Sequence, residues 1–391
     1  MPAFTGSLNT NAIFALIYNM IISQQVFADN LGEHQTLVDE ARVDGGLFGD
    51  QKLFYATDVL KSRAWLGDSE ASNLLSVNRP ASPACQSIVL NIFRQIDVTV
   101  DEYLTKQAWA DEGSFSAFIS VTLGWLRDTK RVYDGTLYNA FIGTDQTSTG
   151  KQLDTVDVTT AVGLATGDEA NRIEAMAIGR KIADIITQMG DYSRAYNDYQ
   201  YLRSYSKGQI KIIWNAAFVN KIRNVDLPTI FHDDFMENLD KRIMPARYFG
   251  VVITASNKST YAASTPTTGK PIDSDDNSYV PGTNNANGCI RSLIEKDVTV
   301  SAVAYHVFPG DEIPAGSTIV ASGTFEPGEV YIEDASIIFK ICVKLPPFMS
   351  AFEVGTSFFN ARSLTTNHYL TWGHNTLEHL KNYPMVTVRK V

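Results

Sequence analysis

A glycine-rich segment is the first of three groups in this 391-residue chain whose residue types could support chemistry. Residues 143–151 resemble a phosphate-binding loop. Six residues separate Gly143 from Gly150, whereas the motif has four, and Gln152 stands where the motif requires a Ser or Thr to bind the metal. The sequence therefore predicts a flexible loop here and no nucleotide site.

Three histidines form the second group. Imidazole is a common metal ligand, and His368, His374 and His379 lie close together in the sequence. Two histidines on one helix share an ion when they are four residues apart, but His374 and His379 are five apart. This spacing points the two rings away from a common ion, so we expect ordinary, partly buried histidines.

The third group consists of His232, Asp233, Asp234 and Glu237. Consecutive side chains diverge on a helix or strand, so these residues would converge on one ion only in an irregular loop. We expect a solvated helix start, with one aspartate near the positive end of the helix dipole. Because the chain also lacks a Gly-x-Ser-x-Gly elbow, the sequence predicts no catalytic residue, no cofactor-binding residue and no metal ligand.

Charge and cysteine content exclude further classes of protein. The formal net charge is -10, and no run of Lys or Arg offers the concentrated basic surface that gripping nucleic acid requires. We therefore expect weak binding to double-stranded DNA, without sequence preference. Cys85, Cys289 and Cys342 are odd in number and far apart, which fits neither a disulfide framework nor a zinc site. Reduced thiols in a cytoplasm are expected.

The apolar segment 12–22 is neither a secretory signal nor a membrane span. No Lys or Arg precedes Arg42, and the run is too short to cross a bilayer. Five of its residues share one helical face: Ile13, Leu16, Ile17, Met20 and Ile21. The pattern predicts a terminal helix that docks either on the chain's own core or on a neighbouring subunit.

One long helix dominates the elements around these groups. Ile96, Val98 and Val100 alternate with polar residues, which predicts a half-buried strand. From Ser114, a plausible N-cap, apolar residues follow helical spacing: Phe115, Phe118, Ile119, Leu123, Leu126, Tyr133, Leu137 and Phe141. At about 1.5 Å per residue, this helix would span roughly 40 Å. A helix of this length, in a chain without a visible catalytic set, suggests a structural scaffold.

The other elements are shorter. Glycines and prolines in residues 46–95 predict a projecting β-hairpin, and a second helix begins near Asp168 and stops at Gly190. A polar aromatic linker follows at 192–205, then a strand at 210–214 and a short helix at 216–223. Residues 254–288 hold almost nothing apolar to bury and predict a long surface loop. Short strands are expected between 298 and 343, and a closing strand at 385–391.

Taken in order, these elements resemble the major capsid protein family of tailed bacteriophages, which has the Hong Kong 97-type fold, and in particular its podophage-like members. The closest local matches are residues 96–141, residues 172–224, and residues 352–372 with the strand after them. The resemblance implies an α+β fold with five parts. These are an N-terminal arm (1–43), an extended β-hairpin loop (44–101), a peripheral domain (102–168) with a spine helix (114–141), an axial domain (169–344) with a surface loop or insertion (254–288), and a C-terminal segment (345–391) that returns to both domains.

The family resemblance also implies a function. The chain would assemble with its own copies into pentamers and hexamers of an icosahedral head that holds double-stranded DNA non-specifically. It would work with a separate scaffolding protein and a portal protein, without a membrane, and reside in the virion after assembly in the host cytoplasm. No enzymatic activity is implied. A non-viral compartment shell or a minor virion protein of the same fold remains an alternative. An α/β hydrolase is a weaker alternative, because it would need convergent carboxylates or a nucleophile in a pocket.

Overall fold

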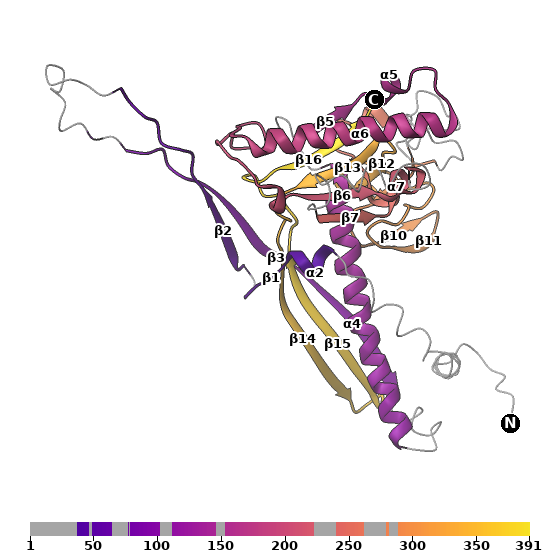
Figure 1. Cartoon of the computed structure of the whole chain (residues 1–391). Helices are drawn as coiled ribbons and strands as arrows, with labels where there is room; N and C mark the ends of the chain where they lie inside the picture. The colour runs from indigo at the N-terminus through magenta and orange to yellow at the C-terminus, as the bar shows by residue number, and fades with distance from the viewer. Residues whose placement is uncertain are drawn as a thin grey trace. The chain divides into compact units, whose positions relative to one another are not determined.

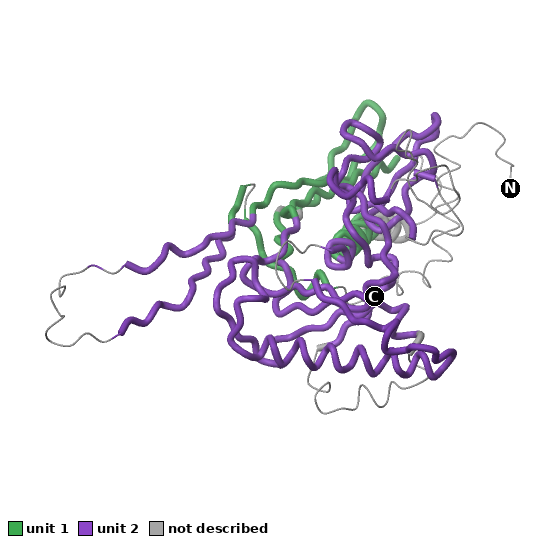
Figure 2. Tube along the Cα trace, turned by 90° about the horizontal axis from the view of Figure 1, so that it is seen from above, with its two compact units in different colours: residues 1–51, 89–138, 347–376 green, residues 52–88, 139–346, 377–391 purple. Residues whose placement is uncertain are grey.

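The computed structural model describes residues 37–46, 49–64, 77, 79–101, 112–145, 153–222, 240–261, 279–280 and 288–391. The chain forms two compact units (Figure 2). Unit 1 comprises Met1–Gln51, Val89–Tyr138 and Pro347–Thr376, and unit 2 comprises Lys52–Ile88, Asn139–Pro346 and Leu377–Val391. The predicted terminal helix, the group around His232, and residues 146–152 of the glycine-rich segment lie outside the described residues.

Unit 1 is built on a five-stranded sheet. Most of β2 and the first residues of β3 in this sheet are assigned to unit 2. The strand order is β1 (Arg42–Asp44), β14 (Phe348–Asn360), β15 (Thr365–Asn375), β3 (Ala84–Asp101) and β2 (Gln51–Ala56) (Figure 1). Strand β15 pairs antiparallel with both β14 and β3, whereas β1 pairs parallel with β14. The half-buried strand predicted around Val98 is confirmed as the second half of the 18-residue β3.

Helix α4 (Glu112–Gly143) confirms the long helix and has 32 residues. It begins two residues before Ser114, so the prediction of Ser114 as the N-cap is wrong. Leu126 and Tyr133 are buried with two β15 side chains in the core of unit 1, namely Leu370 and Trp372. The 3.6-residue period of the helix meets the two-residue period of the strand along this line of contacts.

Unit 2 contains two larger sheets and a ribbon. The first sheet has the order β5 (Leu153–Val156), β16 (Met385–Lys390), β13 (Ile337–Cys342), β6 (Lys211–Asn215) and β7 (Asp240–Met244). The second has the order β4 (Thr144–Asp145), β8 (Gly250–Val252), β12 (Val330–Glu333) and β9 (Ile290–Ser292). Strands β10 (Lys296–Val300) and β11 (Val303–Val307) form a separate antiparallel ribbon.

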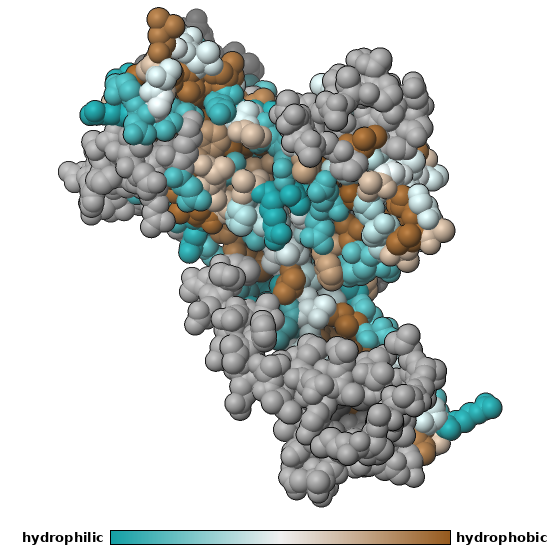
Figure 3. All heavy atoms as spheres, turned by 90° about the vertical axis from the view of Figure 1, so that its right-hand side faces the viewer, coloured by the Kyte–Doolittle hydropathy of each residue, from teal (hydrophilic) through white to brown (hydrophobic). Residues whose placement is uncertain are grey.

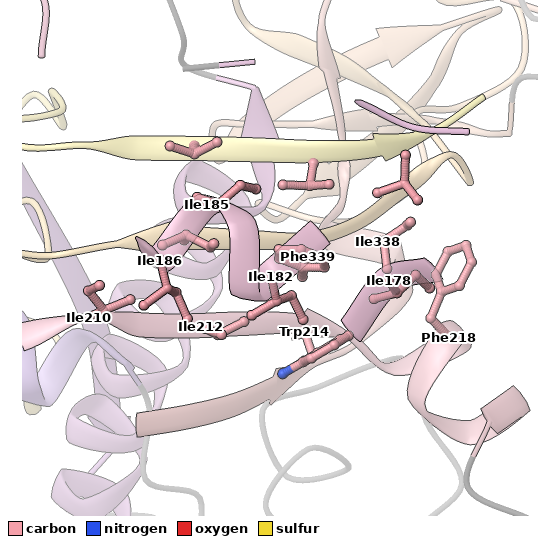
Figure 4. Packing of buried hydrophobic residues seen from close by; sticks show 14 of the residues in the cluster. Ile178, Ile182, Ile185, Ile186, Ile210, Ile212, Trp214, Phe218, Ile338 and Phe339 are labelled. Carbon is pink, nitrogen blue, oxygen red and sulfur yellow. The ribbon is translucent and has the colours of Figure 1, made fainter. Parts of the chain in front are cut away.

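Helix α6 (Gly167–Gly190) packs against the first sheet of unit 2. Its buried face presents Ile178, Ile182, Ile185 and Ile186 to strand and helix residues that include Ile212, Trp214, Phe218 and Phe339 (Figure 4). Helix α7 (Ala216–Ile222) follows β6 directly. The predicted second helix, the strand near residue 212 and the short helix after it are thus confirmed.

Several short elements complete the described chain: α2 (Leu37–Ala41), α5 (Val158–Val162), α10 (Lys258–Tyr261), and the 3-10 turns Lys207–Gln209 and Ala246–Tyr248. Helix α5 and strand β5 were not predicted. Asp157 caps α5, because its side chain accepts a hydrogen bond from the Thr160 amide at 2.8 Å.

Buried tyrosines lie in two segments that the sequence predicted as connections. In the polar aromatic linker at 192–205, Tyr196 and Tyr205 are buried in the same core cluster as the apolar face of α6. In the described part of segment 254–288, Tyr279 is buried in the core of the second sheet, and its hydroxyl donates to the Glu312 carboxylate. In both places an aromatic ring enters the core while its hydroxyl finds a polar partner.

The end of α4 is closely packed in unit 2. Gly143 lies against the backbone of Tyr248, where a Cβ atom would come within 2.1 Å of the carbonyl oxygen. The fully buried Lys340 ammonium donates to the Thr144 carbonyl just beyond the helix. This contact places a cation at the negative end of the helix dipole. Burial lowers the pKa of Lys340 to about 8.

Candidate functional site

The three histidines singled out from the sequence each have their own polar partner. His368 hydrogen-bonds the Ser357 hydroxyl at 2.8 Å, and in unit 2 His379 contacts the Asp198 carboxylate at 2.8 Å. His374 is buried in unit 1. Among the described residues, no three His, Cys, Asp or Glu side chains are grouped so that they could hold a metal ion.

The tautomer of His374 follows from its two contacts. Its Nδ1 lies 2.9 Å from the Asn375 carbonyl oxygen, which can only accept, so Nδ1 carries the proton. Its Nε2 lies 2.9 Å from the Tyr133 hydroxyl and accepts from it. The ring also stacks on Phe348 with centroids 5.5 Å apart. Burial lowers the pKa of His374 from 6.5 to about 4, so the ring is neutral in the folded protein.

Acid is therefore expected to destabilise unit 1 through His374. Below pH 6.5 the unfolded chain binds a proton that the folded chain does not take up until about pH 4. The stability is fully present above pH 6.5, and about 3 kcal/mol is lost as the pH falls to 4. Urea unfolding at pH 7 and pH 4 should show this loss in the wild type. His374→Gln, which does not titrate, should lose less by that amount, and equal losses in both proteins would contradict the assignment.

All three cysteines are free thiols. None of the three forms a disulfide: Cys85 is exposed, Cys289 is half-buried and Cys342 is buried. Burial raises the pKa of the Cys289 thiol, and the nearby Glu312 and Glu333 carboxylates raise it further. A thiol in such surroundings is a poor nucleophile.

Strands β2 and β3 pair as neighbours, and β2 and the segment after it expose apolar side chains. Leu53, Tyr55, Val59 and Leu60 are 48%, 65%, 53% and 78% exposed, and Val77, on the approach to β3, is 77% exposed. Figure 3 shows one face of the molecule, on which hydrophobic residues form separate patches between polar ones. So many large apolar residues exposed within one hairpin indicate a contact surface.

The end of β2 is fixed within unit 2 by a small polar cluster, which we term the hairpin root: Thr57, Asp58, Gln86, Arg194 and Arg203. The two oxygens of Asp58 accept from the Arg194 guanidinium at 2.6 Å and from the Leu202 amide at 3.0 Å. Arg203 donates to the Thr57 carbonyl at 2.7 Å. The Leu202 and Arg194 hydrogen bonds lower the pKa of Asp58 to about 2, so its carboxylate is charged at neutral pH.

Gln86 attaches β3 to the same part of unit 2. Its amide nitrogen donates to the His379 carbonyl at 2.9 Å, and its amide oxygen accepts from the Lys381 amide at 3.0 Å. Both strands of the hairpin are therefore held at their base by side chains that fix direction as well as position. The hairpin root has no nucleophile, acid–base pair or ligand set. It holds the base of a hairpin that exposes large apolar side chains.

Sequence reasoning did not find the hairpin root. Its members stand between 57 and 203 in the chain, and none belongs to a motif or a periodic pattern. The turn-rich composition predicted the hairpin itself, but a carboxylate and two arginines separated by more than a hundred residues carry no signal in a single sequence.

Removing the Asp58 carboxylate is expected to loosen the base of the hairpin. In Asp58→Ala, Arg194 keeps its bond to the Gln200 carbonyl, but the Leu202 amide loses its acceptor. Limited proteolysis of the unassembled protein should then cut within residues 57–64 several times faster than in the wild type. Asp97→Ala, which removes an exposed carboxylate from β3, serves as the control and should leave the rate unchanged. Equal rates in both variants would show that the hairpin root does not hold the hairpin.

Comparison with known structures supports the architecture. No protein-family model and no curated protein matches the chain. The capsid structure of Staphylococcus phage Andhra is 13% identical, with a TM-score of 0.55 over 91% of this chain and 84% of that chain. The structure of the head fiber and inner core protein gp22 of native bacteriophage P68 is 11% identical, with a TM-score of 0.51 over 89% and 83%.

These similarities extend along most of the chain, so they concern the whole fold and not one motif. Within the described ranges, no helix is both long and apolar enough to cross a bilayer. The mixed sheets, the 32-residue helix and the paired strands β2 and β3 agree with the architecture expected from the family resemblance. The chain therefore has the α+β fold of phage capsid structures, the Hong Kong 97-type fold that its sequence resembles.

Proposed function

We propose that this chain is the major capsid protein of a phage head and assembles into pentamers and hexamers that enclose double-stranded DNA. The observation that carries the proposal is the exposed apolar hairpin held by the hairpin root, within a fold shared with a phage capsid. Large apolar side chains gain free energy when another protein removes them from water, at about 25 cal/mol per Å². A rooted hairpin offers such a contact in a fixed direction, as a repeating shell requires.

The parts of the chain take the following roles in this proposal. Residues 1–43 form the N-terminal arm and residues 44–101 the extended hairpin loop, both of which gain contacts from neighbouring copies. Residues 102–168 form the peripheral domain and residues 169–344 the axial domain, with a surface loop or insertion at 254–288. Residues 345–391 return to both domains. Helix α4 is the spine of the peripheral domain, since 32 residues of continuous helix resist bending better than a loop would.

The proposed partners are further copies of the chain, a separate scaffolding protein, a portal protein and the packaged DNA. The net negative charge suits a shell into which DNA must slide during packaging. Basic residues that neutralised the phosphates would bind the DNA and hinder this movement. The site of action is then the virion, after assembly in the host cytoplasm.

Weak DNA binding is the expected solution behaviour. The purified subunit should show no saturable binding to a double-stranded DNA fragment at physiological salt, since a chain of net charge -10 offers no concentrated cationic surface. Fluorescence anisotropy at several salt concentrations measures this. Tight binding that weakens steeply with salt would contradict the reading of the charge.

Negative-stain electron microscopy of the purified full-length protein, with and without a polymer crowder, tests the proposal. Closed shells, or rings with five- and six-fold symmetry, are expected as the protein concentration rises. A chain that stays monomeric throughout would favour a minor virion protein of the same fold. A broad panel of ester and peptide substrates tests the enzyme alternative. Hydrolysis that persists in variants unable to assemble would favour it.

A further inference from the structure

The ribbon β10–β11 presents an open edge without the usual protection. Within the described part of the chain, β11 pairs only with β10, so its other edge has no strand beside it. Exposed edges normally carry lysine, proline or a bulge, which discourages pairing with another chain. The β11 sequence Val-Ala-Tyr-His-Val contains none of these, and its first four residues are exposed. This edge is therefore chemically able to accept a further strand.

The register shows which backbone groups the edge offers. Ser301 and Ala302 form a two-residue turn with positive φ values of 51° and 65°, and Val300 pairs with Val303 across it. In such a hairpin the closing pair is hydrogen-bonded, so bonding alternates along the ribbon. Val303, Tyr305 and Val307 thus direct their N–H and C=O groups toward β10. Ala304 and His306 direct theirs outward.

The side chains on this edge complement themselves. If β11 of a second copy lies antiparallel with Tyr305 opposite its counterpart, Ala304 faces His306 and Val303 faces Val307. The outward groups of Ala304 and His306 then form four hydrogen bonds between the two copies. Val303 and Tyr305, 51% and 42% exposed, lie on the face of the ribbon that also bears the buried Val298 and Val307, and the second copy would cover them.

Charge does not oppose a second copy at this edge. The chain is acidic overall, so most surfaces of two copies repel each other. The one basic side chain of β11 is His306, and its two ring nitrogens contact Asp297 at 2.6 Å and Glu295 at 2.9 Å within its own copy. These contacts raise the pKa of His306, and the two carboxylates balance the charge of the protonated ring within its own copy. No like charges face each other across the proposed pairing.

We infer that β11 is a self-pairing strand, through which two copies of this chain join antiparallel about a two-fold axis at Tyr305 into a four-stranded sheet. The inference goes beyond the proposed function, because it concerns a contact between two free chains and requires no shell. The interface is small, with four backbone hydrogen bonds, so the association is weak. Covalent trapping of the dimer is therefore a better test than a measurement of its mass in solution.

Disulfide trapping tests the pairing. The full-length protein carries Tyr305→Cys in a background of Cys85→Ser and Cys289→Ser, and is oxidised mildly. Residues opposite each other in a non-hydrogen-bonded antiparallel pair have Cα atoms about 4.5 Å apart, within the range that a disulfide spans. A dimer on non-reducing gels is expected. Val303→Cys in the same background is the control, since its two copies would lie roughly 13 Å apart and should not cross-link.

A second variant tests the edge itself. Ala304→Pro removes an outward N–H that the β10–β11 ribbon does not use, so the ribbon should keep its fold while the pairing is blocked. The yield of the Tyr305→Cys dimer should fall at least about tenfold. Equal cross-linking at 303 and 305, or a yield unchanged by Ala304→Pro, would overturn the inference. Shells that form without the 305 cross-link would overturn the self-pairing alone, whereas trapped dimers without shells would support it and count against the capsid function.

Discussion

Leu126→Asp is expected to prevent unit 1 from folding. Leu126 is 4% exposed on α4 and packs with Trp372 and Leu370 of β15. An aspartate there loses the buried leucine contacts and places a carboxylate without a partner in an apolar core, at a cost of at least about 4 kcal/mol. Circular dichroism and urea unfolding of the purified variant measure the loss. Phe118→Asp is expected to fail in the same way, from the helical pattern of the sequence.

Val132→Asp is the matched control for this effect. Val132 lies on the same helix but is 40% exposed, so the same new charge remains in contact with water. Its cost should be about 1 kcal/mol or less. If both variants folded and assembled normally, Leu126 would not lie on the packing face of α4. If both failed, charge on the helix rather than burial would be the cause.

Gly143→Ala is expected to disrupt unit 2 with a single methyl group. The new Cβ would lie 2.1 Å from the carbonyl oxygen and 2.6 Å from the carbonyl carbon of Tyr248. Neither atom belongs to a side chain that can turn away, so the backbone must separate at the end of α4. We expect a loss of about 3 kcal/mol in the free energy of unfolding.

Gly124→Ala provides the opposite result in the same helix. A Cβ at Gly124 meets no atom within 4 Å, and alanine favours the helix over glycine by about 1 kcal/mol. Thermal unfolding should therefore show a higher midpoint for Gly124→Ala and a lower one for Gly143→Ala. A stabilising effect of both substitutions would contradict the close packing of Gly143 against Tyr248.

The elements that the sequence predicted are those with a long, regular pattern. Helix α4 was visible because apolar residues recur at helical spacing from Phe115 to Phe141. Its start was misjudged because the apolar pattern begins only after Glu112 and Gly113, the first two residues of the helix. Helix α5 was missed because Val158, Thr159 and Thr160 are β-branched, a composition that favours strands. Its helix depends on the Asp157 cap and on tertiary contacts that periodicity does not record.

The candidate site was predictable only as a region. Glycine and proline content indicated the hairpin, and the exposure of Tyr55 and Leu60 agrees with a surface that other chains cover. The contacts of Asp58 with Arg194 and Leu202 arise when distant segments meet in the fold. A single sequence shows no local pattern for contacts between distant segments, whereas the buried face of a helix appears as a regular spacing of apolar residues.

Cryo-electron microscopy of the assembled protein tests the central claim most directly. The account predicts closed particles built from five- and six-fold rings of this chain, in which the exposed hairpin residues Leu53, Tyr55, Val59 and Leu60 are buried against neighbouring copies. Particles in which these four side chains remain open to solvent, or a protein that never leaves the monomeric state at any concentration, would contradict it.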